Sequence, residues 1–287
     1  MKRKLFYKFS APSNVTMVLL MIIPLGVAVY LSLHFVTFRN INTPEFVGLS
    51  NYAAILKDSQ FWQAFRFSLT IVVIAVPIQI VLAFIIALLL DQIHSAMRGV
   101  YIALILLPFI VVPVVGTLIF KQLFEVGGLI AYLYRALFDA PFLFTPISVK
   151  VLVILHLIWN VTPYPTIVFF AGLQGLPDSQ LEAAEVDGAT PWQQFTLVVL
   201  PYLRPLLIMT SMILIMDMYR MFDSIMVMTE QNPMFQAENL MMYSYRIGMH
   251  VQRLGKANAT AILTIFGVLV VLVPFLRITY LNQTGKD

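Results

Sequence analysis

Six long apolar runs constrain this chain more than any other feature of its sequence. Each exceeds the roughly 20 residues that an α-helix needs to cross about 30 Å of hydrocarbon. Since lipid offers no partner for backbone amides and carbonyls, such runs favour helices, which satisfy their own backbone groups. The runs cover approximately residues 15–38, 67–90, 100–120, 149–173, 206–229 and 260–281.

The composition agrees with a chain that is surrounded by lipid. Hydrophobic residues make up 60% of the 287 residues and charged residues only 11%, and the mean hydropathy is +0.87. A soluble domain of this length has no core large enough to hide so much apolar surface. We therefore predict an all-α integral membrane protein with about six transmembrane helices.

The charges that precede the first run set the expected orientation. Four cations lie there, namely Lys2, Arg3, Lys4 and Lys8. Cations that flank a first span favour the cytoplasmic side, and an even number of spans returns the C-terminus to that side. We expect a cytoplasmic segment at 1–14, a transmembrane region at 15–281 and a cytoplasmic tail at 282–287.

Motifs for catalysis and for metal binding are missing from the sequence. There is no cysteine, and the four histidines are scattered without metal-ligand spacing. No glycine-rich phosphate loop and no nucleophile elbow is present, so we expect no catalytic residue, no metal and no cofactor in this chain. The net charge of +4 is too diffuse for binding nucleic acid.

A polar stretch, residues 181–205, separates the fourth apolar run from the fifth. It gathers Glu182, Glu185 and Asp187 within a few residues. An ionised carboxylate at bilayer depth costs several kcal/mol. We therefore expect this stretch to lie outside the hydrocarbon, as a loop at one membrane face.

The pattern inside the polar stretch predicts a short helix, a bend and a second short helix. Gly188 suits the bend because it tolerates left-handed backbone angles. Thr190 suits the N-cap of the second helix, and Pro191 suits its first turn. Pro201 and Pro205 are expected to end that helix.

The same stretch resembles the cytoplasmic coupling loop of importer-type ABC permeases, known as the EAA loop. That pattern reads Glu-Ala-Ala, three residues, Gly, nine residues, Ile, one residue and Leu-Pro. The residues at these positions are Glu182, Ala183, Ala184, Gly188, Val198, Leu200 and Pro201. All match the pattern except Val198, which replaces the usual isoleucine. The resemblance implies that these residues, together with Asp187, dock on a separate ATP-hydrolysing subunit rather than catalyse a reaction.

The resemblance extends to permeases that take up carbohydrates, the maltose-permease-like family. It is carried by residues 46–52 (FVGLSNY), 169–177 (FFAGLQGLP) and 220–229 (RMFDSIMVMT). Where this family commonly continues with Gly-Gly-Pro, the chain has the residues EQNP at 230–233. The resemblance implies the type I permease fold of ABC importers, in the inner membrane of a bacterium.

The resemblance also implies an assembly. Its parts would be a second homologous permease, two ATPase subunits that carry ATP and magnesium, and a soluble substrate-binding protein. The expected function is import of a sugar, polyol or glycoside by alternating access. The alternatives are an amino-acid or peptide ABC permease and an ion-coupled secondary transporter, although only Asp217 is an acidic residue clearly inside a run.

Polar side chains within the apolar runs are candidates for the substrate pathway, since each needs a partner that lipid cannot supply. On one continuous helix, Asp217, Arg220, Met221 and Ser224 would share a face at i, i+3, i+4 and i+7. Two structural alternatives stay open: an ion pair between Asp217 and Arg220, and a bond from Asn160 to a carbonyl freed by Pro163 or Pro165. The candidates are Asn160, Tyr164, Asp217, Tyr219, Arg220, Met221 and Ser224.

Overall fold

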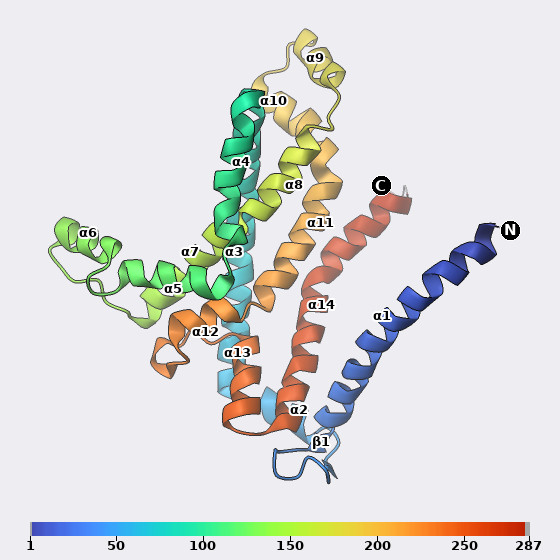
Figure 1. Cartoon of the computed structure of the whole chain (residues 1–287), viewed down its shortest axis with the longest axis vertical. Helices are drawn as coiled ribbons and strands as arrows, with labels where there is room; N and C mark the ends of the chain where they lie inside the picture. Colours follow the sequence, from blue (N-terminus) through green and yellow to red (C-terminus); the bar gives the residue numbers. More distant parts are fainter. Residues whose placement is uncertain (1, 285–287) are drawn as a thin grey trace. The chain divides into compact units, whose positions relative to one another are not determined.

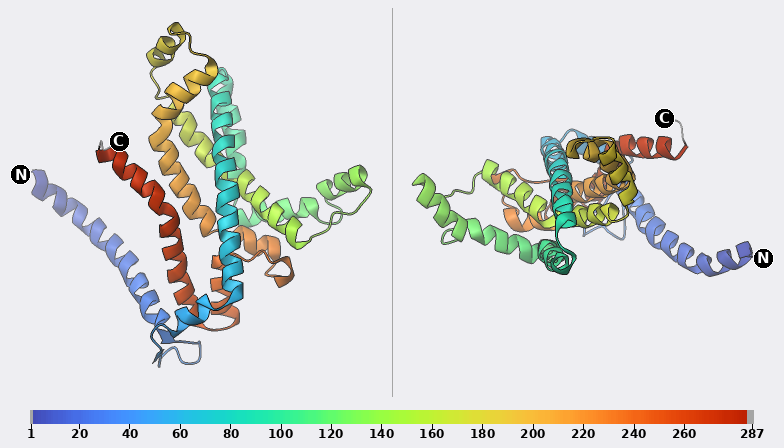
Figure 2. Two further views of the ribbon diagram at one scale, coloured as in Figure 1. Left: turned by 180° about the vertical axis from the view of Figure 1, so that it is seen from behind. Right: turned by 90° about the horizontal axis from the view of Figure 1, so that it is seen from above.

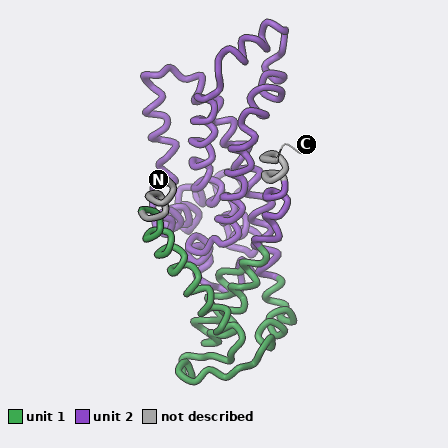
Figure 3. Tube along the Cα trace, turned by 90° about the vertical axis from the view of Figure 1, so that its right-hand side faces the viewer, with its two compact units in different colours: residues 1–62, 240–267 green, residues 63–239, 268–287 purple. Residues whose placement is uncertain are grey.

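A computed structural model describes residues 2–284, with the side chains of residues 9–277. The chain forms two compact units, residues 1–62 with 240–267 (unit 1) and residues 63–239 with 268–287 (unit 2) (Figure 3). The side chains of the N-terminal cations and residues 285–287 of the expected tail at 282–287 lie outside the described residues.

The described chain is mostly helical (Figure 1). Two strands of two residues each form one small antiparallel hairpin, in which His34 pairs with Phe46. The elements are α1 (Lys2–Ser32), β1 (His34–Phe35), β2 (Glu45–Phe46), α2 (Ser50–Leu56), α3 (Ser59–Gln92), α4 (Ser95–Ile110), α5 (Pro113–Phe124), α6 (Leu129–Phe138), α7 (Pro146–Val161), α8 (Pro163–Leu173), α9 (Asp178–Val186), α10 (Pro191–Gln194), η1 (Phe195–Val199), α11 (Leu200–Tyr219), α12 (Asp223–Thr229), η2 (Pro233–Phe235), α13 (Leu240–Tyr245), η3 (Arg246–His250) and α14 (Leu254–Thr284).

Six helical segments of the described chain are long and apolar enough to cross a membrane. This number confirms the prediction of six spans, although several boundaries differ. The segments are Phe9–Ser32, Ser59–Gln92, Pro113–Phe138, Pro146–Leu173, Pro191–Thr229 and Leu254–Arg277.

The third predicted span, residues 100–120, is wrong as a single helix. The helix α4 ends at Ile110, and Val112 has extended backbone angles before α5 begins at Pro113. Proline lacks the N–H that would continue a helix and disfavours helical angles at the residue before it. Figures 1 and 2 show α5 and α6 leading away sideways from α3 and α4.

The fifth predicted span, residues 206–229, is also broken. The helix α11 ends at Tyr219, and α12 begins at Asp223. Arg220 has φ −104° and ψ 8°, outside the helical range. The side-chain amide of Asn239 donates a hydrogen bond to the carbonyl of Met221 inside this break, which helps to satisfy the backbone that the break exposes.

In unit 1, the end of α1 is tied to the start of α14 through the backbone. A Cβ added at Gly255 would lie 2.1 Å from the carbonyl oxygen of His34, so only glycine fits there. The side-chain amide of Asn51 donates to the carbonyls of Ser32 at 2.8 Å and His34 at 3.0 Å. These bonds hold the hairpin and α2 against that corner.

In unit 2, the helix α3 runs in the same direction as α7 and α8. The side-chain amide of Gln79 in α3 donates to the carbonyl of Leu157 in α7 at 3.0 Å. Further along both segments the side-chain amide of Gln174, just after α8, donates to Asp91 Oδ1 near the end of α3 at 2.5 Å. Because contacts advance along both segments together, their N-terminal ends lie at the same end of the unit.

Candidate functional site

The polar stretch at 181–205 folds as the sequence pattern predicts in its first half. The helix α9 ends at Val186, and Gly188 takes a left-handed angle, φ +77°. Thr190 caps α10: its hydroxyl accepts from the backbone of Gln193, whose side chain accepts from the Thr190 N–H at 2.8 Å. This reciprocal pair, with Pro191 in the first turn, fixes where the second helix starts.

The expectation that Pro201 and Pro205 end the second helix is wrong. A π-helical turn, η1, connects α10 to α11, and α11 contains both prolines. The N–H of Leu200 bonds to the carbonyl of Phe195, five residues back. The wider turn reduces the clash between a proline ring and the preceding turn, so the helix continues.

An apolar cluster anchors this loop to the spans of unit 2. The Phe84 ring stacks on Phe169 with centroids 4.0 Å apart and meets Phe195 edge-on. The hydroxyl of Tyr202 donates to the carbonyl of Gly175 at 2.5 Å. The buried members of the cluster are Ala83, Phe84, Ala87, Phe169, Leu173, Leu176, Val199 and Leu203.

Beyond that anchor the loop presents both carboxylates and apolar side chains to its surroundings. Val186 is 87% exposed, Trp192 71% and Leu197 70%. Exposed apolar side chains that lie among charged ones are typical of a protein docking surface. The predicted coupling residues Glu182, Ala183, Asp187, Gly188 and Pro201 are exposed, and Ala184 and Leu200 are half-buried.

Asn160 is buried and bonds to neither of the expected carbonyls. Its amide donates to the carbonyl of Pro108 at 2.6 Å. In an intact helix that carbonyl would accept from residue 112, but Val112 is extended because α4 has ended. Asn160 therefore satisfies the break in α4, rather than a carbonyl freed by Pro163 or Pro165.

Asp217 and Arg220 form an ion pair in the structure. The guanidinium of Arg220 donates to Asp217 Oδ1 at 2.9 Å, and their side chains are 42% and 65% exposed respectively. The predicted common face with Met221 and Ser224 is wrong, because the helix ends before them. Ser224 is buried on α12.

Of the two tyrosines predicted for the substrate pathway, Tyr164 is half-buried and Tyr219 is fully buried. The ring of Tyr164 lies 6.2 Å from that of Phe109. Tyr219 is fully buried, and its hydroxyl has no hydrogen-bond partner in the described structure; the same holds for the hydroxyl of Ser224 and for Oε1 of Gln79. Gln79 is not among the residues predicted for the pathway, although a lone glutamine inside an apolar run is a signal of the same kind as Asn160.

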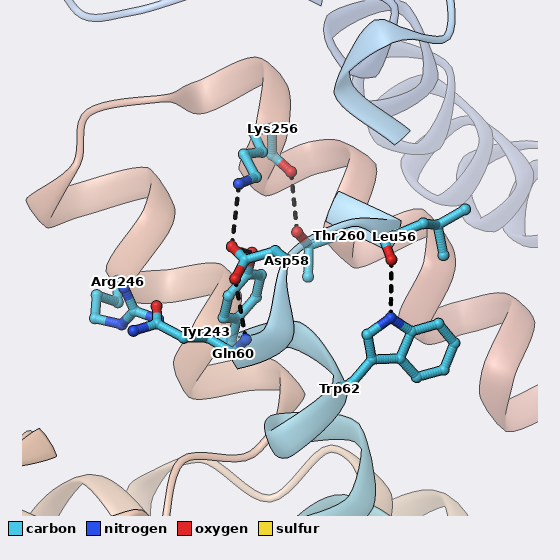
Figure 4. A network of polar contacts seen from close by, with 8 residues as sticks. All are labelled: Leu56, Asp58, Gln60, Trp62, Tyr243, Arg246, Lys256 and Thr260. Carbon is cyan, nitrogen blue, oxygen red and sulfur yellow. Dashed lines mark hydrogen bonds and ion pairs between the residues drawn. The ribbon is translucent and has the colours of Figure 1, made fainter. Parts of the chain in front are cut away.

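Unit 1 contains a polar cluster that the sequence did not single out as a site (Figure 4). The hydroxyl of Tyr243 donates to Asp58 Oδ2 at 2.7 Å, and Lys256 Nζ lies 3.3 Å from the same oxygen. Burial raises the pKa of Asp58, but bonds from Tyr243, the Gln60 N–H and Lys256 outweigh it, and the net pKa is lowered. The carboxylate therefore stays ionised and links α3 to α13 and α14.

The described residues offer no metal centre: no group of three or more His, Cys, Asp or Glu side chains is placed to hold an ion. What the geometry does provide is a bundle of apolar spans with one anchored, exposed helical loop. These features together are typical of a multi-pass membrane subunit with a docking loop, and comparison with known proteins identifies the family.

The family model for the inner membrane component of binding-protein-dependent transport systems matches residues 46–284. A probable ABC transporter permease of Sinorhizobium fredii is 31% identical, over 93% of this chain and 87% of its own length. The trehalose transport permease SugA of Mycobacterium tuberculosis is 31% identical, over 79% of this chain and 74% of its own. The trehalose/maltose permease MalF of Thermococcus litoralis is 29% identical, over 96% and 93%.

The fold agrees with a solved structure. The crystal structure of a bacterial ABC transporter that imports alginate contains a chain with TM-score 0.79 and 21% identity, covering 100% of this chain and 97% of that one. The chain belongs to the family of inner membrane components of binding-protein-dependent transport systems. It is a multi-pass permease subunit of an ABC importer, as the resemblance implied.

Proposed function

We propose that this chain forms part of the pathway of an ATP-driven importer for a sugar, polyol or glycoside. A soluble binding protein delivers the substrate, and a second homologous permease completes the pathway. Two separate ATPase subunits bind ATP and magnesium and drive alternating access. The support is the set of relatives named for trehalose, maltose and lactose, each similar over most of this chain.

The observation that carries this proposal is the exposed loop at 181–205. Its first helix bears Glu182, and Asp187 directly follows that helix, on a surface that nothing else in the described chain covers. Its second helix continues into α11 without a break. A subunit that docks on this loop therefore pushes directly on a membrane span. The loop then lies in the cytoplasm, on the same side as both termini.

For the substrate pathway, we propose a division of roles among the polar groups of the spans. Asp217 and Arg220 are partly exposed and polar, which suits hydrogen bonding to sugar hydroxyls. Tyr164 and Met221 are half-buried and suit apolar contact with a sugar ring. Asn160 instead supports the broken backbone, and Tyr219 and Ser224 are enclosed by the surrounding helices.

The test is affinity purification of the chain from its native membrane in mild detergent. We expect an ATPase and a second permease to copurify, and ATP hydrolysis to rise on addition of a binding protein with a sugar such as trehalose. Stimulation by amino acids or peptides alone would replace the carbohydrate assignment. Recovery of the chain without any ATPase would contradict the importer mechanism.

A charge reversal sharpens this test. Glu182→Arg should reduce ATPase recovery and transport at least tenfold, because it places a cation where a carboxylate docks, while the amount of chain in the membrane stays normal. Gln180→Arg is the matched control, since Gln180 is exposed on the same helix outside the coupling pattern. Equal losses in both variants would indicate a general effect on the helix, and unchanged transport in Glu182→Arg would remove the coupling role.

A further inference from the structure

A polar pocket lies near the N-terminal ends of two spans of unit 2. It encloses about 240 Å³. Five of its lining residues come from α3 and α7, and the sixth from the segment after η2. They are Gln63, Arg66, Phe67, Thr70, Lys150 and Gln236. Two of the six carry a positive charge, and none carries a negative one.

The two cations of the pocket have no acidic partner in the described chain. Several other cations of the spans are paired: Lys121 with Glu125 and Glu230, Arg220 with Asp217, and Lys256 with Asp58. Lys150 instead lies over the ring of Phe67, with Nζ 5.9 Å from the centroid. A cation in a membrane-spanning helix requires a counter-charge or access to water.

The position of the pocket along its two helices indicates which part of the membrane it faces. Arg66 directly precedes the apolar run of α3 that starts at Phe67, and Lys150 is the second residue of the run at 149–173. Since α3 and α7 run in the same direction, both runs begin at the same membrane border. Lipid phosphates lie at that border, between the hydrocarbon and the water.

We propose that this pocket binds the phosphate of an anionic lipid headgroup, in the leaflet opposite the coupling loop. Arg66 and Lys150 supply charge-assisted hydrogen bonds to the phosphate oxygens. The side-chain amides of Gln63 and Gln236 and the hydroxyl of Thr70 suit the glycerol hydroxyls of phosphatidylglycerol. Free phosphate shares the oxyanion chemistry, but the position at the start of two apolar runs favours a lipid.

The test uses the full complex reconstituted in nanodiscs of phosphatidylcholine with or without phosphatidylglycerol. Native mass spectrometry then counts the lipids that stay bound. We expect retention of phosphatidylglycerol over phosphatidylcholine, weakened roughly fivefold for each cation removed in Arg66→Gln and Lys150→Gln. Lys57→Gln is the matched control, because Lys57 is an exposed cation outside the pocket.

Two further arms keep the result unambiguous. Arg66→Lys and Lys150→Arg preserve the charge and should retain the lipid, so a loss caused by misfolding is recognised. Inorganic phosphate serves as competitor. If phosphate stays bound while phosphatidylglycerol is retained no better than phosphatidylcholine, the ligand is free phosphate and the lipid assignment is overturned. Equal retention by the wild type and the double variant Arg66→Gln/Lys150→Gln would also overturn it.

Discussion

The two ends of α11 are built on different principles. At its start the helix passes through Pro201 and Pro205, which lack the N–H groups that a helix needs. It is continuous there because the π-turn before it widens the backbone, and because the turns around Val199 and Leu203 are buried in an apolar cluster. Packing therefore outweighs the local tendency to break.

At its far end α11 stops at Tyr219, although no proline is near. The break is surrounded by polar bonds instead: Asp217 pairs with Arg220, and Asn239 donates to the carbonyl of Met221. Tyr219 itself is fully buried. One end is held by apolar packing and the other by hydrogen bonds, so substitutions at the two ends should differ in kind.

The largest effect is expected at the packed end. A Cβ at Gly172 would lie 2.6 Å from the side chains of both Leu203 and Leu206. Gly172→Val should destabilise the fold by about 1–3 kcal/mol, the usual range for overpacking, and thermal unfolding of the purified chain measures it. Gly99→Val is the control, because Gly99 has open space around it. Equal shifts in the two variants would contradict close packing of α8 on α11.

A smaller effect on stability is expected at the polar end. The ion pair of Asp217 with Arg220 is partly exposed, and exposed pairs contribute at most about 1 kcal/mol. Asp217→Asn should therefore leave the unfolding temperature nearly unchanged. If the carboxylate contacts substrate, the apparent KM for transport rises several-fold in the same variant. Arg220→Gln is the companion variant: loss of assembly in both, with unchanged KM, would assign the pair a purely structural role.

The smallest effect on stability is expected in the polar cluster of unit 1, where Asp58 bonds to Tyr243 and Lys256. This cluster holds helix ends together in a third way, through a shared carboxylate. The pKa of Asp58 lies below its ordinary value of 3.8, so ionised Asp58 favours the folded state. Its contribution is complete above pH 3.8 and is lost as the pH falls through the lowered pKa. The unfolding temperature should therefore decline less steeply with acid in Asp58→Asn than in the wild type. Asp139→Asn, at an exposed carboxylate, should leave the slope unchanged.

Much of the fold follows from patterns that are local in sequence. The apolar runs predict six spans because length and hydrophobicity decide that outcome without reference to the rest of the chain. The bend at Gly188 and the cap at Thr190 are predictable for the same reason. The helix breaks after Ile110 and Tyr219 do not follow from one local pattern. Proline is present at the first break and absent at the second, so no single sequence signal predicts both.

The candidate site shows the same division. The exposure of Glu182 follows from its own charge, so it can be predicted without knowing which residues lie near it in the fold. The partner of Asn160 does not follow, because the carbonyl of Pro108 comes from a helix that is distant in sequence. The cluster around Asp58 was not predicted, because Asp58 and Lys256 lie almost 200 residues apart in the sequence. Helical periodicity relates only residues that are a few turns apart.

The helix α11, from Leu200 to Tyr219, gives the chain a lever. At 1.5 Å per residue its 20 residues are about 30 Å long, and a tilt of about 5° at its base would move its far end by about 2.6 Å. The lever starts beside the exposed loop at 181–205 and ends close to the partly exposed Asp217. A tilt imposed at one membrane face therefore displaces this helix most at its far end, in the opposite half of the bilayer.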